Sequence, residues 1–147
     1  MKLTNSQEEY LKIIYILKNT ENEIKVTEIA NKLNITKASV NSGIKSLKDA
    51  GLINYEPYKQ IELTEQGEKE AIKIIEAYDI VKLFLTDIIG AKKENVEEEA
   101  KNIKTILSDD SINKLAIYTH KTLGLYSLEC GYDINKEKCI KCARRGN

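Results

Sequence analysis

The sequence contains few of the residues that strands and turns depend on. Its 147 residues include one proline, seven glycines, one phenylalanine and no tryptophan. Because Ile, Leu, Lys and Glu are abundant instead, helices are expected to dominate. No apolar run approaches the ~20 residues that span a bilayer, and the polar, acidic first residues do not form a secretory signal. We therefore expect a mainly α, cytoplasmic protein with no membrane partner.

Net charge is also absent, because 23 basic side chains balance 23 acidic ones. This balance argues against a protein that binds polyanions through bulk charge. The balance is uneven along the chain: residues 1–65 hold nine lysines and nine acids, residues 66–125 nine and eleven, and residues 126–147 five basic residues and three acids. Both arginines, Arg144 and Arg145, lie in the last segment. Phosphate contacts elsewhere must therefore come from lysine, a point charge without bidentate geometry.

Three short amphipathic helices are predicted at the start of the chain. Ser6 and Glu9 have the spacing of a capping box for the first, which should run to about residue 18. Thr27 is the expected N-cap of the second helix, and Asn34 can take the left-handed conformation that ends it. Thr36 should cap the third helix. Two helices joined by so short a turn form a helix-turn-helix unit.

Two short strands, 52–55 and 61–64, should follow as a β-wing. Beyond them the apolar spacing is helical over residues 66–89, 95–107 and from the capping Ser108 to about 123. The long apolar stripe of the first of these helices needs a partner surface. We therefore predict a winged helix-turn-helix domain (1–65), a second, helical domain (66–123), to which the resemblance described below assigns dimerisation, and a cysteine-containing tail (124–147).

The third helix and the wing carry the candidate DNA contacts. A recognition helix places its first turns against base edges in the major groove, while the wing holds phosphates. Asn41 is the best base reader, because its amide can bond adenine bidentately, and Ala38 offers a methyl contact to thymine. A homodimer would place two such helices about 34–36 Å apart on a pseudo-palindromic operator in double-stranded DNA. The predicted DNA-binding residues are Thr36, Lys37, Ala38, Ser39, Asn41, Ser42, Lys45, Tyr58 and Lys59.

All three cysteines lie in the tail, as Cys130-x8-Cys139-x2-Cys142. A Cys-x-x-Cys pair lets two thiolates reach one metal from a tight turn, and a third cysteine can add a ligand. His120, the only histidine, is a candidate fourth ligand of a zinc site. An iron–sulfur cluster fits equally well, and three reduced thiols without metal are the third alternative. The tail could thus sense a cluster, metal or redox change, or could be a structural zinc knuckle.

Several segments, in order along the chain, resemble the diphtheria-toxin repressor family. They are SQEEYL (6–11), VTEIA (26–30), SV (39–40), Leu47, GLI (51–53), YE (55–56), Tyr58, IELTEQG (61–67), FL (84–85), IG (89–90) and EA (99–100). The resemblance covers residues 3 to about 115 and is closest to the two-domain manganese-transport-regulator branch. It implies a homodimeric, metal-responsive transcription regulator with an N-terminal winged helix and a helical dimerisation domain.

The resemblance also assigns six metal-ligand positions, and only Glu9 keeps a side chain that can serve as a ligand. The other five positions hold Lys12, Tyr78, Lys101, Lys104 and Thr105. Because a protonated lysine cannot bind a divalent ion and repels it, the ordinary manganese or iron site is not expected. Two explanations stay open. The site has decayed into a solvated face, or the lysine ammoniums replace the cation and pair with Glu9, Asp79 or Glu98.

The leading interpretation is a dimeric DNA-binding repressor whose effector acts at the cysteine tail. The alternative is a winged-helix protein-interaction module with a structural zinc-binding tail. An enzyme is not expected, because no Ser-His-Asp, His-Glu-x-x-His or phosphate-binding glycine pattern is present. A single histidine also leaves little acid–base chemistry near neutral pH.

Overall fold

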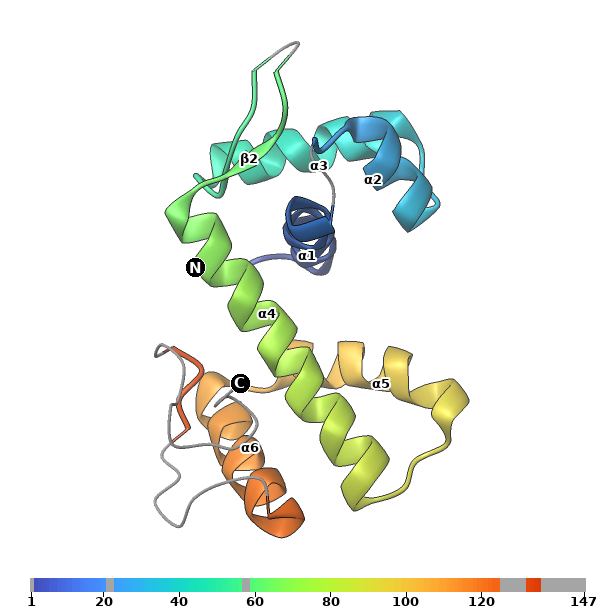
Figure 1. Ribbon diagram of the computed structural model, residues 1–147, viewed down its shortest axis with the longest axis vertical. Coiled ribbons are helices and arrows are strands. Elements are labelled where there is room, and N and C mark those ends of the chain that lie inside the picture. Colours follow the sequence, from blue (N-terminus) through green and yellow to red (C-terminus); the bar gives the residue numbers. More distant parts are fainter. Residues whose placement is uncertain (1, 21–22, 57–58, 125–131, 136–147) are drawn as a thin grey trace. The chain divides into compact units, whose positions relative to one another are not determined.

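The computed structural model describes residues 2–20, 23–56, 59–124 and 132–135. Over these residues the chain forms two compact units, Met1–Ile74 (unit 1) and Ile75–Asn147 (unit 2). The long helix α4, Glu65–Leu83, contributes residues to both (Figure 1). Within the described ranges, none of the helices has both the length and the apolarity needed to cross a membrane.

Unit 1 opens with three helices. They are α1 (Asn5–Thr20), α2 (Val26–Leu33) and α3 (Lys37–Asp49). At the start of α1, Gln7 N donates to Thr4 Oγ1 (3.2 Å) and Thr4 N donates to Gln7 Oε1 (2.9 Å). This reciprocal pair is a capping box. The predicted box of Ser6 and Glu9 is wrong, because Ser6 already lies inside the helix.

The helix-turn-helix is formed by α2 and α3. Thr27 lies within α2 and not at its N-cap, so that prediction is wrong. Asn34 ends the helix with φ 53° and ψ 49°, the predicted left-handed conformation. Thr36 caps α3 as predicted, since its Oγ1 accepts a hydrogen bond from Ser39 N at 3.1 Å. Local capping chemistry therefore sets both sides of the turn.

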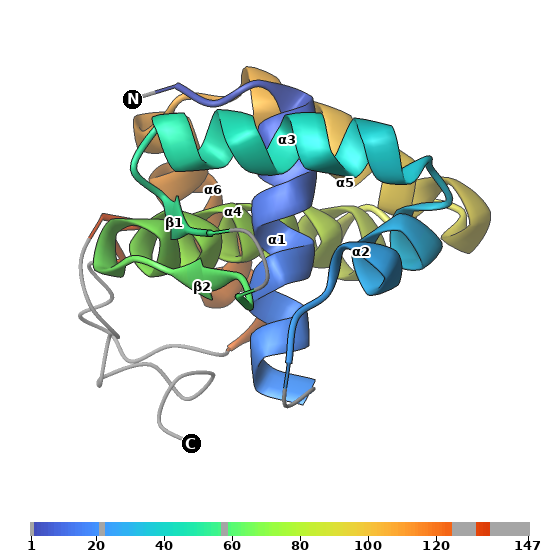
Figure 2. The same cartoon turned by 90° about the horizontal axis from the view of Figure 1, so that it is seen from above.

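The three helices share an apolar core, and Figure 2 shows α3 crossing α1. Its fully buried side chains include Leu11, Ile14, Leu17, Ile29, Val40, Ile44 and Leu47. The approach of α1 to α3 is closest at Gly43, where an added β-carbon would collide with the ring of Tyr10. Tyr10 Oη also donates to the carbonyl of Ser39 at 3.1 Å. The apolar side of α3 is thus fixed on α1, which leaves its polar side in solvent.

The wing consists of two short antiparallel strands. They are β1 (Ile53–Asn54) and β2 (Glu62–Leu63), which pair Ile53 with Leu63 and Asn54 with Glu62. Both lie inside the predicted ranges but are shorter than predicted, because the ladder is limited to these two residue pairs.

One threonine ties the base of the wing to the start of α4. Thr64 Oγ1 donates to the carbonyl of Gly51 (2.7 Å) and accepts from Gly67 N (3.0 Å). Gly51 follows the end of α3 with φ 77°, a conformation that favours glycine. An added β-carbon at Gly67 would collide with the carbonyl oxygen of Leu52. The wing is therefore held rigidly at its base by backbone packing.

Unit 2 is helical over its described residues. After α4 come a π-helical turn η1 (Phe84–Ile88), α5 (Lys93–Ile106) and α6 (Asp109–Leu123). The predicted helix to residue 89 is confirmed in extent, but its last turn is widened, with Ile89 N donating to Phe84 O at 3.2 Å. Gly90 follows with φ 65°. Ser108 caps α6 as predicted, since its Oγ accepts from Ser111 N at 3.2 Å.

The core of unit 2 includes two residues from beyond the last helix. Its buried members are Ala77, Ile80, Val81, Leu85, Val96, Ala100, Ile112, Ala116, Tyr132 and Ile134. The mainly α architecture with a winged helix-turn-helix and a helical second part is confirmed. Cys130, Cys139 and Cys142 lie outside the described residues.

Candidate nucleic-acid interface

The exposed side of α3 carries most of the predicted DNA contacts. Val40, Ile44 and Leu47 are spaced so that they lie on one side of α3, and this side is buried. Solvent therefore reaches the predicted set Thr36, Lys37, Ala38, Ser39, Asn41, Ser42 and Lys45, all of which are exposed. The first turn is held in place, since Thr36 Oγ1 also donates to Ser39 Oγ at 3.0 Å. Of the two predicted wing contacts, Tyr58 lies outside the described residues and Lys59 is exposed.

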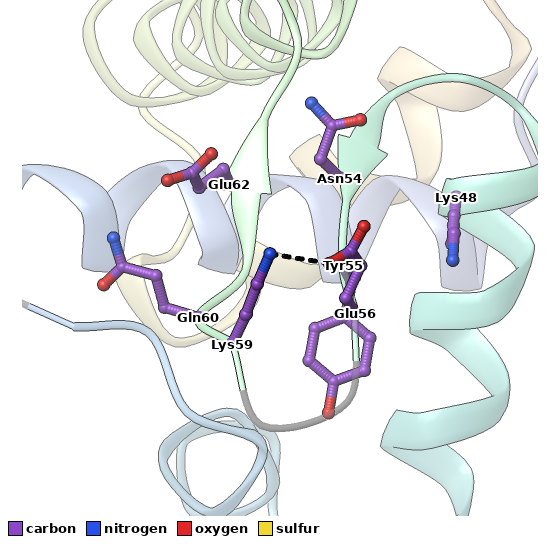
Figure 3. Close-up of a pocket in the computed structure, with 7 residues that line it drawn as sticks. All are labelled: Lys48, Asn54, Tyr55, Glu56, Lys59, Gln60 and Glu62. Carbon is purple, nitrogen blue, oxygen red and sulfur yellow. Dashed lines mark ion pairs between the residues drawn. The ribbon is translucent and has the colours of Figure 1, made fainter.

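The wing places a second group of polar side chains beside α3. A hollow of about 530 Å³ is lined by Lys48, Asn54, Tyr55, Glu56, Lys59, Gln60 and Glu62 (Figure 3). Lys48 enters this lining from α3, whereas the other residues belong to the wing. Polar residues of α3 and of the wing therefore line the same hollow and form one polar surface.

Lys59 forms an ion pair with Glu56 on the wing. Its Nζ lies 2.8 Å from Glu56 Oε2, and the two side chains are 73% and 65% exposed. Exposed pairs of this kind contribute about 0–1 kcal/mol, so the ammonium can exchange the carboxylate for a phosphate at little cost. The sequence reasoning named Lys59 but did not foresee this partner.

Lys48 is absent from the predicted DNA-binding set, yet it lines the hollow together with Lys59. A signal for it was present, because Lys48 follows Lys45 by three residues and neighbours it on the helix surface. With Lys37 these lysines give the interface its basic groups. The helix α3 therefore carries an excess of positive charge, with Lys37, Lys45 and Lys48 against Asp49, although the chain is neutral as a whole.

On α5, the positions that the family resemblance assigns to metal ligands hold side chains of a different kind. Lys104 is buried, with 9% of its surface exposed, while Lys101 is exposed. The hydroxyl of Thr105 donates to the carbonyl of Lys101 at 2.9 Å, within the helix itself. Two ammonium groups and a hydroxyl engaged with its own helix do not make a ligand set for manganese or iron, which take carboxylate and imidazole ligands.

On α4 the ring of Tyr78 occupies the position of the family's histidine. Lys82 Nζ lies 5.7 Å from the centroid of this ring, a cation–π distance. The same ammonium is 3.8 Å from Glu97 Oε1 on α5. A phenol ring beside a cation does not fit a divalent ion either. Among the described residues, no group of three or more His, Cys, Asp or Glu side chains gathers as a metal site.

His120, the predicted fourth ligand of the tail, lies in the core of unit 2 with 1% of its surface exposed. Its ring meets the ring of Tyr132 edge to face, with centroids 5.9 Å apart and planes at 84°. Tyr132 Oη donates to Glu76 Oε2 on α4 at 3.2 Å. Because the three cysteines lie outside the described residues, a site that combines them with His120 stays a prediction.

Residues 132–135, here named the anchor segment, are fastened to α6. Ile134 N donates to Asn113 Oδ1 at 2.8 Å, and Asn113 Nδ2 donates to Asp133 Oδ1 at 3.4 Å. Asn135 Nδ2 donates to Asp109 Oδ2, at the start of α6, at 3.1 Å. A part of the tail is therefore a fixed component of unit 2.

The fold and the exposed recognition helix define a winged helix-turn-helix protein of the DNA-binding class, followed by a helical second part. The family models agree with this class. Residues 2–61 match the N-terminal DNA-binding domain of the iron-dependent repressors, and residues 64–121 match their metal-binding and dimerisation domain. The chain belongs to the iron-dependent repressor family, as the sequence resemblance predicted. Members of this family are DNA-binding transcription regulators that act as homodimers, and are not enzymes.

Relatives and solved structures place the match along most of the chain. An uncharacterized HTH-type transcriptional regulator of Methanocaldococcus jannaschii is 38% identical over 120 residues, 81% of this chain and 96% of that protein. The HTH-type transcriptional regulator MntR of Lysinibacillus sphaericus is 29% identical over 113 residues, 77% of this chain and 81% of its own.

Two solved structures share the fold. The manganese regulator SloR gives a TM-score of 0.70 at 22% identity, covering 92% of this chain and 65% of SloR. A hypothetical protein from Sulfolobus solfataricus gives 0.64 at 24% identity, covering 90% of this chain and 98% of that one. The chain thus spans 65% of the length of SloR.

Proposed function

We propose that this protein is a cytoplasmic, sequence-specific transcriptional repressor that binds DNA as a homodimer and responds to an effector at its C-terminal cysteines. Residues 1–65 would bind the operator, residues 66–123 would form the dimer, and residues 124–147 would sense an iron–sulfur cluster, zinc or a redox change. The single observation that carries the sensing role is the anchor segment, which fixes part of the tail to α6.

The DNA-binding part of the proposal rests on the exposed face of α3. Asn41 and Ser42 stand on a helix whose opposite side is fixed in the core, so their positions are set by the fold. Lys37 and Lys45 flank them and can contact phosphates, which fix the register of a protein on DNA. With few charges per subunit, affinity depends on dimerisation, which places two recognition helices about 34–36 Å apart on a pseudo-palindrome.

The sensing part rests on where the cysteines lie relative to the anchor segment. Cys130 precedes Tyr132 by two residues, and Cys139 follows Asn135 by four. The anchor segment is buried at Tyr132 and hydrogen-bonded to α6 through Ile134. A change in what the thiolates bind would therefore pull on an element that is packed into the core of unit 2. This gives the tail a route to the domain that the family uses for dimerisation.

The test is to purify the full chain without oxygen and measure iron, sulfide and zinc together with affinity for DNA from upstream of its own gene. We expect one bound cluster or zinc per chain, and a change in DNA affinity when it is removed or oxidised. The control variant replaces all three cysteines with serine and should lose both the metal and the response. A metal-free folded dimer whose DNA affinity does not change when oxidant is added would contradict the sensing role.

The same samples distinguish DNA binding from a protein-interaction role. Each phosphate neutralised contributes about −0.9 to the slope of log affinity against log salt concentration. We expect a slope that corresponds to several lysine–phosphate contacts per dimer. A flat salt dependence, or no binding to any duplex, would instead favour a winged helix that docks proteins and uses the tail as a zinc-stabilised arm.

A further inference from the structure

The burial of Lys104 distinguishes the two explanations for the lysines at the family's ligand positions. A site that had decayed into a solvated face would leave this side chain in water, as it leaves Lys101 on the same helix. Lys104 is instead 9% exposed, on the side of α5 that also buries Val96 and Ala100. The lysine at this position is therefore part of the folded interior and not a surface residue.

An ammonium that leaves water needs oxygen acceptors or opposite charges around it, as a metal cation does. Moving a charge out of water into a protein is costly, even after the protein has relaxed around it. Oxygen acceptors or opposite charges must compensate this cost. An ammonium has three donors and no acceptor, so its partners must be oxygens, as are the preferred ligands of hard divalent ions. A lysine can thus satisfy acidic and carbonyl oxygens that would otherwise be left uncompensated when no metal is bound.

A second lysine of unit 2, Lys82, differs from Lys104 because its side chain is 43% exposed, but its ammonium also lies beside one of these positions. Lys82 lies over the ring of Tyr78, which holds the family's histidine position, and it reaches Glu97 on α5. The side chains at these positions therefore bring protein cations to α4 and α5. Three of the five changed ligand positions, Lys12, Lys101 and Lys104, now carry positive charge of their own.

We propose that Lys104 supplies, as a permanent ammonium, the positive charge that a divalent cation supplies to metal-responsive members of the family. The DNA-binding state of this protein then needs neither manganese nor iron at this position. The inference rests on the proposed function as a DNA-binding regulator, and it explains why a sensor would lie elsewhere in the chain. Asp79, which follows Tyr78 and is half-buried, is the expected anionic partner.

The first measurement uses the wild-type full chain. Calorimetric titration with Mn²⁺ alone should give no binding at micromolar concentrations. DNA affinity measured by fluorescence anisotropy should change less than about twofold between chelator and excess Mn²⁺, a difference of roughly 0.4 kcal/mol. Tight Mn²⁺ binding that raises DNA affinity tenfold or more would overturn the inference while leaving the proposed function intact. A chain that binds no duplex under either condition would overturn both.

The second measurement compares three variants in chelator. Lys104→Met keeps the length of the apolar stem but removes the charge, and should lower DNA affinity about tenfold, or ~1.4 kcal/mol. Lys104→Arg keeps the charge and should restore most of the affinity. Lys114→Met is the control, because Lys114 is 75% exposed on α6 and pairs with Asp110. Wild-type affinity in a folded Lys104→Met protein would overturn the inference, and if that variant does not fold, the Mn²⁺ titration of the wild type decides.

Discussion

Lys59 and Glu56 neutralise each other on the wing, with Nζ and Oε2 2.8 Å apart (Figure 3). The wing therefore offers DNA a cation that is already paired, beside a hollow that Lys48 also lines. A phosphate that approaches Lys59 must displace the carboxylate and is repelled by it. We therefore expect Glu56 to weaken binding to any duplex, whatever its sequence.

Replacing Glu56 with glutamine should strengthen DNA binding by about two- to fivefold per subunit at low salt, the range expected for one exposed charge pair. The increase should be equal for operator and random DNA, because phosphates carry no sequence information. The measurement is anisotropy with both duplexes across a salt series. Glu65→Gln is the matched control, since Glu65 is exposed and pairs with Lys69 on α4. An equal increase in this control, or an unchanged Glu56→Gln affinity, would contradict a role for the wing pair.

Substitutions of Asn41 and Lys45 should distinguish a contact to a base from a contact to a phosphate. Asn41→Ala is expected to lose about 1–3 kcal/mol on the operator and little on random DNA, because it removes a contact to a base edge. Lys45→Ala should weaken binding to both duplexes and reduce the salt slope by about 0.9 per subunit, or about 1.8 for the dimer. The check is the ratio of operator to random affinity for each variant. A constant ratio in Asn41→Ala would exclude this residue as a base reader.

The predictions that depend on neighbouring residues succeeded most often. Asn34 and Thr36 act within a few residues of the turn they define, so the sequence contains all that is needed to place them. At α1 two capping patterns overlap, Thr4 with Gln7 and Ser6 with Glu9, and propensity alone does not choose between them. The structure uses the Thr4–Gln7 pattern, which starts α1 earlier than the Ser6–Glu9 pattern would. Leu3, just before this cap, is buried in the core of unit 1.

The features that sequence reasoning missed depend on residues far apart in the chain. The hollow joins Lys48 on α3 to the wing, and the anchor segment meets α6 about 20 residues earlier in the sequence. The burial of Lys104 results likewise from tertiary packing, which a charge pattern does not reveal. The family resemblance located the lysines at the ligand positions, but only the fold distinguishes the buried Lys104 from the exposed Lys101.

Gly67 should tolerate no side chain. Its α-carbon lies against the carbonyl oxygen of Leu52, which is backbone and cannot rotate aside, so Gly67→Ala must shift the base of the wing. Overpacking of this kind costs about 1–3 kcal/mol. Thermal unfolding followed by circular dichroism should show a lower Tm, whereas Gln66→Ala on the exposed side of the same turn should change it little. Equal Tm values for the two variants would refute the close contact.

We expect Asn113 to couple the anchor segment, and through it the cysteine-containing tail, to the rest of unit 2. Its side chain accepts from Ile134 N and donates to Asp133, so Asn113→Ala removes two hydrogen bonds that hold the anchor segment on α6. Each contributes about 0.5–1.5 kcal/mol, so we expect a lower Tm together with faster hydrogen exchange and proteolysis within residues 132–135. If the tail acts through this segment, the variant should keep its basal DNA affinity but lose its response to oxidant or metal removal. Asn102→Ala, an exposed amide on α5, is the control. A full response in an Asn113→Ala protein whose anchor segment exchanges freely would mean that the cysteines act by another route.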